Sequence, residues 1–286
     1  MKILITGCNG QLGNELQLLE KEHEGHTYYN TDVAELDITN LDAVEHFVHD
    51  NRIDGIVNCA AYTAVDKAED NDELCTRLNA EAPAYLARAI ERQGGWMIQI
   101  STDYVFNGQH NMPYTEDEDT CPASVYGRTK LVGEFNVLKF CQKAIIIRTA
   151  WLYSSFGNNF VKTMIRLGHE RAELGVVFDQ IGTPTYARDL AVAIMTVIDK
   201  GIVPGIYHFT NEGIASWYDF ALAIHRLAGI TQCHIRPLHT AEYPTAAQRP
   251  PYSVLDKSKI KATYGIEIPY WGDSLAECIK KLTINH

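Results

Sequence analysis

Near the start of the chain, three glycines recur at every third position between an apolar run and an amphipathic stretch. They are Gly7, Gly10 and Gly13, and residues 2–6 before them predict a short buried strand. The leucines that follow predict a helix. Glycines at a strand–helix turn allow a tight bend and let the backbone approach a pyrophosphate, which binds the free N–H groups of the helix. Three glycines alone would be weak evidence, but in this setting they indicate a nucleotide-binding α/β domain.

Strands and helices alternate after this turn. The predicted strands are residues 2–6, 26–31, 53–58, 96–101 and 143–149, and amphipathic helices are predicted at 41–48 and from 73 onward. Such alternation implies parallel crossovers and a doubly wound parallel sheet of Rossmann type. Ligands on these sheets bind beyond the carboxyl ends of the strands, which is where the glycine turn falls.

The alternation loosens after residue 150. We therefore expect a dinucleotide-binding domain in residues 1–150 and a smaller, discontinuous substrate lobe in residues 151–286, with segments that return to the first domain. Within the lobe, Ser216 and Asp219 form a predicted capping box ahead of an apolar helix face.

Polar and small residues follow the second and third strands. Asp32 suits the adenine-side ribose hydroxyls and would repel a 2′-phosphate, so it favours NAD over NADP. Asp37 is the alternative residue for binding this ribose, in which case Asp32 is only a turn residue. Ile38 would pack on the adenine base of the cofactor. Small residues around Ala61 allow the close approach of a cofactor or reflect tight packing.

A tyrosine and a lysine four residues apart, Tyr126 and Lys130, stand on one face of a predicted helix. An ammonium near the phenol would lower the phenol's pKa from about 10. A tyrosine tuned in this way can donate a proton to a carbonyl oxygen that gains charge during hydride attack. Such pairs are also common on ordinary helices, so the assignment depends on the glycine turn and on the strand that ends at Thr102.

Composition narrows the classes of function. A net charge of −11 argues against a nucleic-acid binder, and no apolar run approaches the ~18 residues of a membrane span. The seven scattered cysteines contain no Cys-x-x-Cys pair, which favours reduced thiols and a cytoplasmic protein. The eleven histidines show no spacing typical of metal ligands.

With these residues in view, the chain resembles the extended short-chain dehydrogenase/reductase family. Within that family it is similar to the enzymes that reduce C4 of dTDP-4-dehydro-β-L-rhamnose with NADPH or NADH. The segments that carry the resemblance are Gly7 to Gly13, Val57 to Glu69, Ser101 to Phe106, Tyr126 to Lys130, Arg148 to Trp151, Asp179 to Thr185 and Arg249-Pro250.

The resemblance implies roles for individual residues. Tyr126 would donate the proton, Lys130 would hold the nicotinamide ribose, and Thr102 would hydrogen-bond the reacting oxygen or the phenol. The cofactor would be lined by Gly7, Gly10, Gln11, Leu12, Gly13, Asp32, Asp37, Ile38, Ala61, Tyr62, Thr63, Tyr126 and Lys130. The nucleotide sugar would contact Thr102, Asp103, Phe106, Trp151 and Arg249, the last as a bidentate cation for a diphosphate.

Some relatives bridge a homodimer through Mg²⁺ held by acidic residues. Glu15 is present, but Arg188 stands where a carboxylate would be needed, so no metal is predicted and a homodimer is left open. A sibling nucleotide-sugar epimerase or dehydratase is an alternative, although Tyr104 replaces the second acid of the dehydratase pair. A non-catalytic, dinucleotide-binding regulatory subunit is the alternative from another class.

Overall fold

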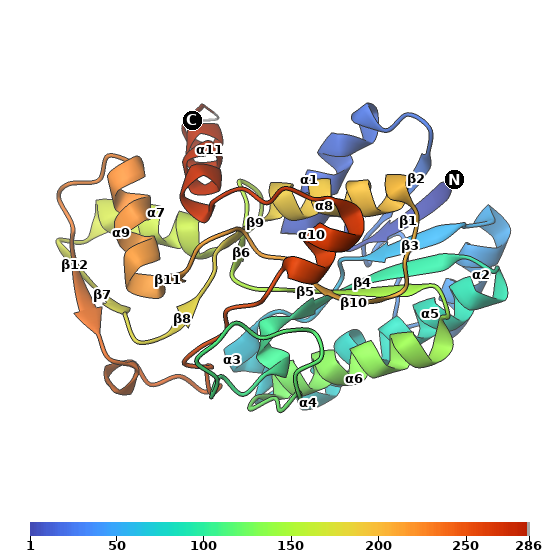
Figure 1. The fold of residues 1–286 in the computed structure, drawn as a ribbon, viewed down its shortest axis with the longest axis horizontal. Helices are drawn as coiled ribbons and strands as arrows, with labels where there is room; N and C mark the ends of the chain where they lie inside the picture. Colours follow the sequence, from blue (N-terminus) through green and yellow to red (C-terminus); the bar gives the residue numbers. More distant parts are fainter. Residues whose placement is uncertain (285–286) are drawn as a thin grey trace.

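A six-stranded parallel sheet forms the larger part of the structure, a computed structural model that describes residues 1–284 (Figure 1). In spatial order its strands are β10 (Gly205–His208), β5 (Ala144–Thr149), β4 (Trp96–Thr102), β3 (Gly55–Asn58), β1 (Lys2–Thr6) and β2 (Thr27–Thr31). Every neighbouring pair is parallel. The predicted doubly wound parallel sheet is confirmed, with strand boundaries within two residues of those expected.

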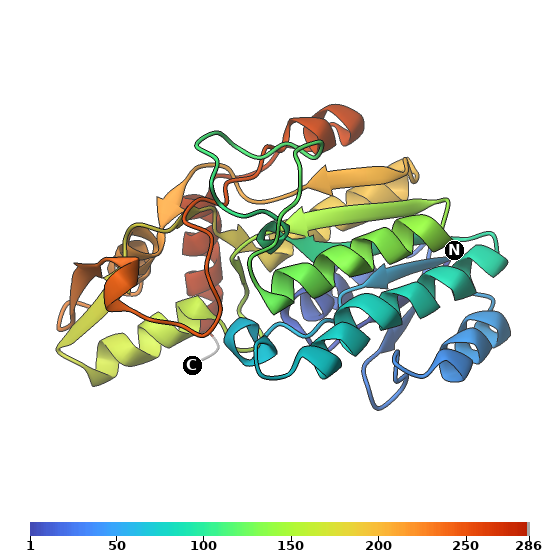
Figure 2. The same cartoon turned by 90° about the horizontal axis from the view of Figure 1, so that it is seen from below.

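Helices cover both faces of the sheet because the strands are apolar on both sides. Ile3 and Ile5 of β1 belong to one core and Leu4 to the other, as successive strand residues point to opposite faces. The first core is closed by α1 (Gln11–Leu19), α8 (Ala187–Lys200) and α10 (Ser258–Tyr264). The second is closed by α2 (Leu41–Asn51), α5 (Ala82–Arg92) and α6 (Val125–Phe140), of which α5 and α6 lie in front of the sheet in Figure 2.

The order in which strands are added to the sheet changes sides at β1, although all strands stay parallel. The chain passes from β1 to β2 on one side and then returns to β3 on the other. The connections that follow β1 and β3 therefore diverge and leave a crevice at the carboxyl ends of these strands. Gly7 occupies this point with a φ of +66°, and a Cβ on it would lie 2.7 Å from the backbone nitrogen of Ala60.

The long helix predicted from residue 73 is interrupted. It consists of α4 (Asp72–Thr76), a π-helical segment (Arg77–Glu81) and α5. Asn79 lies in the π-helical segment, where its side chain accepts from the Tyr62 N–H at 2.8 Å and donates to the Tyr62 carbonyl at 3.1 Å. Pro83, which lacks an N–H, lies at the start of α5. The interruption thus turns Asn79 toward the loop that follows β3.

A smaller lobe with a core of its own lies on the left of Figure 1. Its elements are β7 (Glu173–Val177), β12 (His234–Leu238), α7 (Phe160–Glu170), α9 (Trp217–Leu227) and α11 (Trp271–Ile284). The capping box predicted at Ser216 and Asp219 opens α9, with Asp219 N–H donating to Ser216 Oγ at 3.0 Å. Asn159 caps α7 in the same way, accepting from the Lys162 N–H at 3.1 Å.

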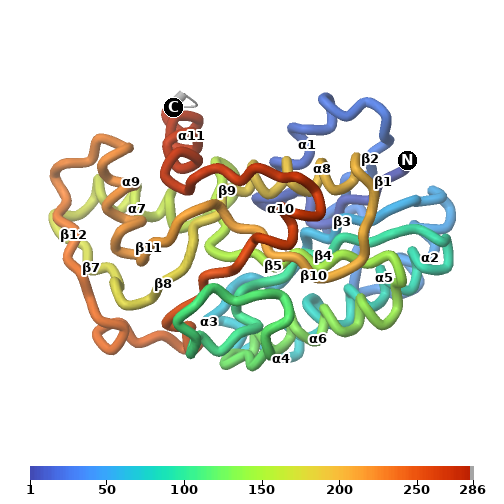
Figure 3. The backbone as a smooth tube through the Cα atoms, viewed as in Figure 1, coloured from blue at the N-terminus to red at the C-terminus, as the bar shows by residue number. Residues whose placement is uncertain are grey.

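The lobe is discontinuous, as expected, because the chain returns to the large sheet. Figure 3 shows α8, β10 and α10 returning to the large sheet, with β10 beside β5. The pairing of β10 with β5, from Gly205 opposite Ile145 to His208 opposite Arg148, was not predicted. The boundary at residue 150 stays a prediction.

Short elements complete the chain. They are α3 (Val65–Ala68), β6 (Leu152–Tyr153), β8 (Ile181–Gly182), β9 (Thr185–Tyr186), β11 (Ala215–Ser216) and 3₁₀ turns at Glu20–Glu22, Asp103–Val105 and Thr240–Glu242. Within residues 1–284, no helix combines the length and apolar character that crossing a membrane requires.

Candidate active site

A cavity of about 760 Å³ opens at the carboxyl ends of the strands, between the large sheet and the lobe. Most of the residues that the sequence places in a site line this one cavity. They are Gly7, Gly10, Gln11, Leu12, Gly13, Asp32, Asp37, Ile38, Ala61, Thr63, Thr102, Asp103, Tyr126, Lys130 and Trp151. Their convergence comes from strands that end at the same edge of the sheet.

The glycine turn forms one wall of the cavity with bare backbone. The Gly10 N–H donates to the Gly7 carbonyl at 3.0 Å, which closes the turn ahead of α1. A Cβ on Gly13 would lie 2.6 Å from the Cα of Cys8, so only glycine allows the helix to begin so close to the strand. The free N–H groups at the start of α1 suit a pyrophosphate, and the cavity has room for a dinucleotide.

Two carboxylates line the end of the cavity beyond β2, and they are held differently. Asp32 accepts from the N–H of Asn9 at 3.2 Å and from the N–H of Val33 at 2.8 Å. Asp37 is exposed and accepts from the N–H and hydroxyl of Thr39, which hold the pKa of its carboxyl below the usual value. Asp32 is therefore the carboxylate that the glycine turn itself orients, through Asn9.

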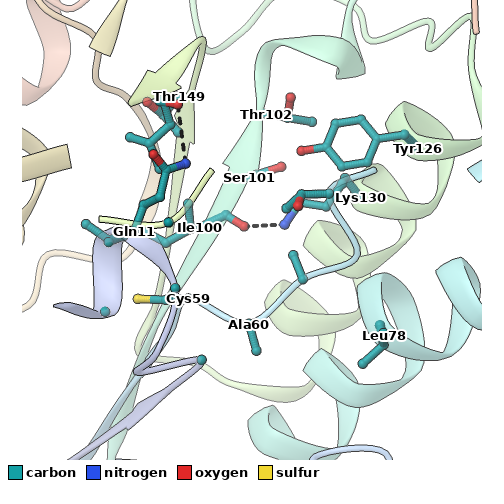
Figure 4. Close-up of a pocket in the computed structure, with 18 of the residues that line it drawn as sticks. Gln11, Cys59, Ala60, Leu78, Ile100, Ser101, Thr102, Tyr126, Lys130 and Thr149 are labelled. Carbon is teal, nitrogen blue, oxygen red and sulfur yellow. Dashed lines mark hydrogen bonds between the residues drawn. The ribbon is translucent and has the colours of Figure 1, made fainter. Parts of the chain in front are cut away.

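The Tyr–Lys helix lies on the opposite side. Ser124 caps α6 by accepting from the Gly127 N–H at 3.1 Å, and this fixes the first turn, which carries Tyr126. Lys130 donates from Nζ to the carbonyl oxygen of Ile100 at 2.6 Å. Figure 4 shows the Tyr126 hydroxyl pointing toward the end of β4, with Lys130 beside it on the same face of the helix.

The protonation of this pair corrects one sequence-based expectation. Burial raises the pKa of Tyr126 well above its ordinary value, with the Thr102 hydroxyl acting in the opposite direction. The expected lowering by Lys130 is wrong for the structure as it stands, because the ammonium is directed to the Ile100 carbonyl. Burial lowers the pKa of Lys130 itself to about 8.

The end of β4 adds a hydroxyl and a carboxyl. Thr102 Oγ1 donates to Asp103 Oδ1 at 3.0 Å and accepts from the Tyr104 N–H at 3.2 Å. Burial raises the pKa of Asp103 to about 6. The hydroxyls of Ser253 and Thr102 oppose this shift, because they stabilise the charged carboxylate.

The lobe contributes an aromatic wall that sequence reasoning predicted only in part. Trp151 stacks on Trp217 with ring centroids 3.6 Å apart and an interplanar angle of 11°. Trp151 has a φ of +48°, a backbone conformation that non-glycine residues rarely adopt. Trp217 lines the cavity but was recognised only as part of a helix start, because no local pattern links it to Trp151.

Other cavity residues were also missed. They are Val33, Leu36, Val65, Leu78, Ile100, Ser101, Tyr104, Ala150, Leu152, Gly157, Asn158 and Asn159. Cys59, Ala60 and Thr149 also line the cavity, as their places after β3 and at the end of β5 indicate. Those from strand ends follow from the same logic as Thr102. The segment at 157–159 reaches the cavity through Asn159, whose side chain donates to Gln11 Oε1 at 2.9 Å.

Three predicted site residues do not line the cavity. Phe106 is buried in a separate cluster, stacked on Tyr114 with ring centroids 4.2 Å apart. Tyr62 has its backbone held by Asn79. Arg249 makes a bidentate pair with Asp66, at 2.9 Å and 2.8 Å.

Among residues 1–284, no group of three or more His, Cys, Asp or Glu side chains is arranged to hold a metal ion. Glu15 is buried and accepts from the Ser154 hydroxyl at 2.6 Å. Arg188 donates from Nη1 to the backbone oxygen of Glu15 at 3.5 Å, and Arg188 Nη2 lies 3.3 Å from Glu22.

A parallel sheet of this strand order, with a Tyr–Lys helix facing a bare glycine turn across one cavity, defines a class of protein. The class is the NAD(P)-dependent oxidoreductases of the short-chain dehydrogenase/reductase type. The absence of side chains at Gly7 and Gly10 fits the pyrophosphate of such a cofactor.

Comparison with known proteins identifies the family. The family model described as "RmlD substrate binding domain" matches residues 1–284. A curated dTDP-4-dehydrorhamnose reductase of Aggregatibacter actinomycetemcomitans is 42% identical over 284 residues, which cover 96% of this chain and 97% of that protein. The chain belongs to the RmlD substrate binding domain family, and the resemblance expected from the motifs is confirmed.

Solved structures agree. A dTDP-4-dehydrorhamnose reductase from Clostridium acetobutylicum has a TM-score of 0.96 and 48% identity, covering 99% of this chain and 100% of that chain. Another, from Bacillus anthracis and in complex with NADP, has a TM-score of 0.94 and 40% identity, covering 98% of this chain and 99% of that chain.

Proposed function

We propose that the protein transfers hydride from NAD(P)H to C4 of dTDP-4-dehydro-β-L-rhamnose and so forms dTDP-L-rhamnose. The observation that carries the proposal is the meeting of Tyr126, Lys130 and Thr102 with the glycine turn around one cavity. The near full-length similarity to dTDP-4-dehydrorhamnose reductases supports the choice of substrate.

Each group of this chain has a defined task in the proposed reaction. When bound, NAD(P)H supplies the hydride. Tyr126 donates its proton to the C4 oxygen, and Thr102 hydrogen-bonds that oxygen or the phenol. Lys130 binds the nicotinamide ribose, and its charge favours the phenolate that the proton transfer leaves behind. The Trp151 and Trp217 wall excludes water from the sugar's side of the cavity.

The cofactor end of the site is assigned to the glycine turn and Asp32. The carboxylate of Asp32 suits the ribose hydroxyls of NADH, while the similar Bacillus anthracis structure contains NADP. Both reduced cofactors are therefore assayed, and the change in the ratio of their kcat/KM values between the wild-type protein and Asp32→Asn measures the effect of Asp32.

The decisive experiment follows the consumption of NADH and NADPH with the dTDP-linked 4-keto sugar and determines the stereochemistry of the product by NMR. We expect turnover that depends on the keto sugar, with UDP- and GDP-linked 4-keto-6-deoxy sugars reduced more slowly. A protein that binds NADPH tightly but never consumes it would instead be a non-catalytic binding subunit. Release of a dehydrated or epimerised sugar would indicate a sibling enzyme.

Two further expectations concern the setting of the protein. All seven cysteines are free, including the exposed Cys121, and on this basis we infer that the protein acts in the reducing cytoplasm. A homodimer stays a prediction, which sedimentation equilibrium of the purified protein will test.

A further inference from the structure

A buried ion pair lies behind the reacting end of the cavity, and the steps proposed above do not use it. The side chains of Glu134 in α6 and Arg148 in β5 are 1% and 3% exposed. Arg148 donates from Nη2 to Glu134 Oε2 at 2.7 Å and from Nε to Oε1 at 3.0 Å. A buried pair loses hydration, so apolar side chains of similar volume often give equal or greater stability. Stability alone is therefore a weak explanation for this pair.

The pair is tied to the same strand as the catalytic lysine. Lys130 and Glu134 stand four residues apart on one face of α6. Lys130 donates to the carbonyl of Ile100, and Ser101, the next residue of β4, donates from its hydroxyl to Glu134 Oε1 at 2.5 Å. Ser101 is also the cross-strand partner of Arg148. Successive turns of the helix thus hold successive residues at the end of β4.

We propose that Glu134 is a positioning residue for the reduction: fixed by Arg148 and Ser101, its carboxylate keeps the Lys130 ammonium charged beside the cavity. The role in the reaction rests on the proposed function, whereas the effect on Lys130 does not depend on it.

The surroundings of Lys130 make Glu134 the source of this effect. Burial lowers the pKa of Lys130 to about 8, and Glu134 is first among the groups that oppose the shift, followed by Cys75 of α4 and Cys59 after β3. Burial raises the pKa of both thiols, that of Cys59 to about 12, so both are neutral near pH 7. Of these three neighbours, only Glu134 then carries the compensating negative charge.

The first test measures the lysine directly, without cofactor or turnover. In protein labelled with [ε-¹³C]lysine, the Lys130 signal is identified by its absence from Lys130→Arg protein, and it titrates apart from ordinary lysines. We expect a midpoint near 8 in the wild-type protein and a midpoint lower by about one pH unit in Glu134→Gln. An unchanged midpoint in Glu134→Gln overturns the proposal.

Matched variants separate charge from structure. Glu134→Asp keeps the charge, so its midpoint should stay nearer to the wild-type value than that of Glu134→Gln. Asp72→Asn removes a carboxylate from the exposed pair that Asp72 forms with Arg128 of α6, and it should leave the midpoint in place. Equal shifts in all three variants would indicate a general loss of charge or structure and would overturn the specific role of Glu134.

Removal of one member of a buried pair can prevent folding. If Glu134→Gln does not fold, the double variant Glu134→Gln/Arg148→Gln decides the question, because it leaves neither charge unpaired. The Lys130 midpoint should again fall below the wild-type value, since the carboxylate that opposes the effect of burial is gone. A midpoint that stays or rises overturns the proposal.

The second test links the residue to the reaction. Because a charged Lys130 is required, kcat should decline as pH rises through its pKa, and Glu134→Gln should move this decline to lower pH by the shift seen in the NMR titration. A shifted NMR midpoint with an unshifted decline in kcat would remove the role in reduction. A wild-type protein without turnover would contradict the proposed function instead, while the NMR result would still stand.

Discussion

At the scale of single residues, the phenol of Tyr126 lies at the boundary between a buried helix face and the cavity. Its pKa is raised by burial, so it is protonated at neutral pH, as a proton donor must be. Lys130 and Thr102 act on the phenolate that follows and not on the resting phenol. The resting structure therefore favours the neutral phenol of Tyr126. The Lys130 ammonium, which can stabilise the phenolate, lies beside it.

Replacement of Tyr126 by phenylalanine should abolish reduction because no other described hydroxyl combines this position with an adjacent ammonium. We expect kcat to fall by a factor of about 10² to 10⁴, the range that general acids supply. NADPH affinity and the unfolding midpoint should stay close to those of the wild-type protein. Tyr28→Phe, which removes a remote hydroxyl hydrogen-bonded to the His23 carbonyl, is the matched control. Retention of most of kcat in Tyr126→Phe would remove the assigned acid.

His208 gives a prediction about pH and stability. Burial, followed by the nearby Arg148 cation, lowers the pKa of this imidazole to about 3. In the unfolded chain its pKa is about 6.5, so between these values the unfolded state binds a proton that the folded state does not. The free energy of unfolding should therefore fall by about 2 kcal/mol between pH 7.5 and pH 5 on account of His208.

Urea unfolding at the two pH values tests this, with His208→Gln and the exposed His49→Gln as a matched pair. The His208→Gln protein should lose less stability on acidification than the wild-type protein, whereas His49→Gln should behave as the wild type. Parallel curves for all three proteins would show that His208 is not the group that titrates.

At the scale of elements, the strand-end arrangement depends on a close approach of two backbone segments that only glycine allows. Gly7 and Gly94 share nearly the same φ, +66° and +68°. A Cβ on Gly7 meets the backbone of Ala60, whereas a Cβ on Gly94 meets nothing within 4 Å. Substitution of Gly94 by alanine should cost about 1 kcal/mol of stability through the left-handed backbone, and Gly7→Ala should cost more because its Cβ displaces Ala60. Only Gly7→Ala should also weaken NADPH binding, by at least about tenfold. Isothermal titration of the two variants checks this, and equal affinities would contradict it.

The sequence predicted the sheet well because its strands are short apolar runs with clear turn signals. It also predicted Gly7, Asp32 and Thr102 at the cavity, because the ends of parallel strands meet at one edge. It did not predict β10, whose partner β5 lies some sixty residues earlier in the chain, where no local pattern could show the pairing.

Burial and distant contacts explain the other differences. The raised pKa of Tyr126 depends on how deeply the helix is packed, which residue spacing does not show. Trp217 reaches the cavity through a stack with Trp151, formed across two segments of the lobe. Phe106 belongs to a motif that matches the family, yet its ring is directed to the core.

At the scale of the whole molecule, one ion pair joins the large domain to the lobe beside the cavity. The carboxylate of Asp66 in α3 accepts hydrogen bonds from both Nη1 and Nη2 of Arg249. It also accepts from the Ala247 N–H at 3.2 Å. The sequence assigned Arg249 to the substrate diphosphate, but the structure pairs it with Asp66. These two roles make different predictions for two single variants.

We expect Asp66→Asn to loosen the segment around Ala247, with faster hydrogen exchange of that N–H. Global stability should change by no more than about 1 kcal/mol, because the pair is partly exposed.

The same variant leaves the guanidinium of Arg249 free to bind a diphosphate, whereas Arg249→Gln removes the guanidinium. If Arg249 exchanges Asp66 for substrate, KM for the nucleotide sugar should rise about tenfold in Arg249→Gln and much less in Asp66→Asn. Glu170→Gln, which breaks the exposed pair of Glu170 with Arg166, should change neither the exchange rate nor KM. Equal increases in KM for Asp66→Asn and Arg249→Gln would mean that the pair only holds the lobe against the large domain. They would contradict a direct contact between Arg249 and the substrate.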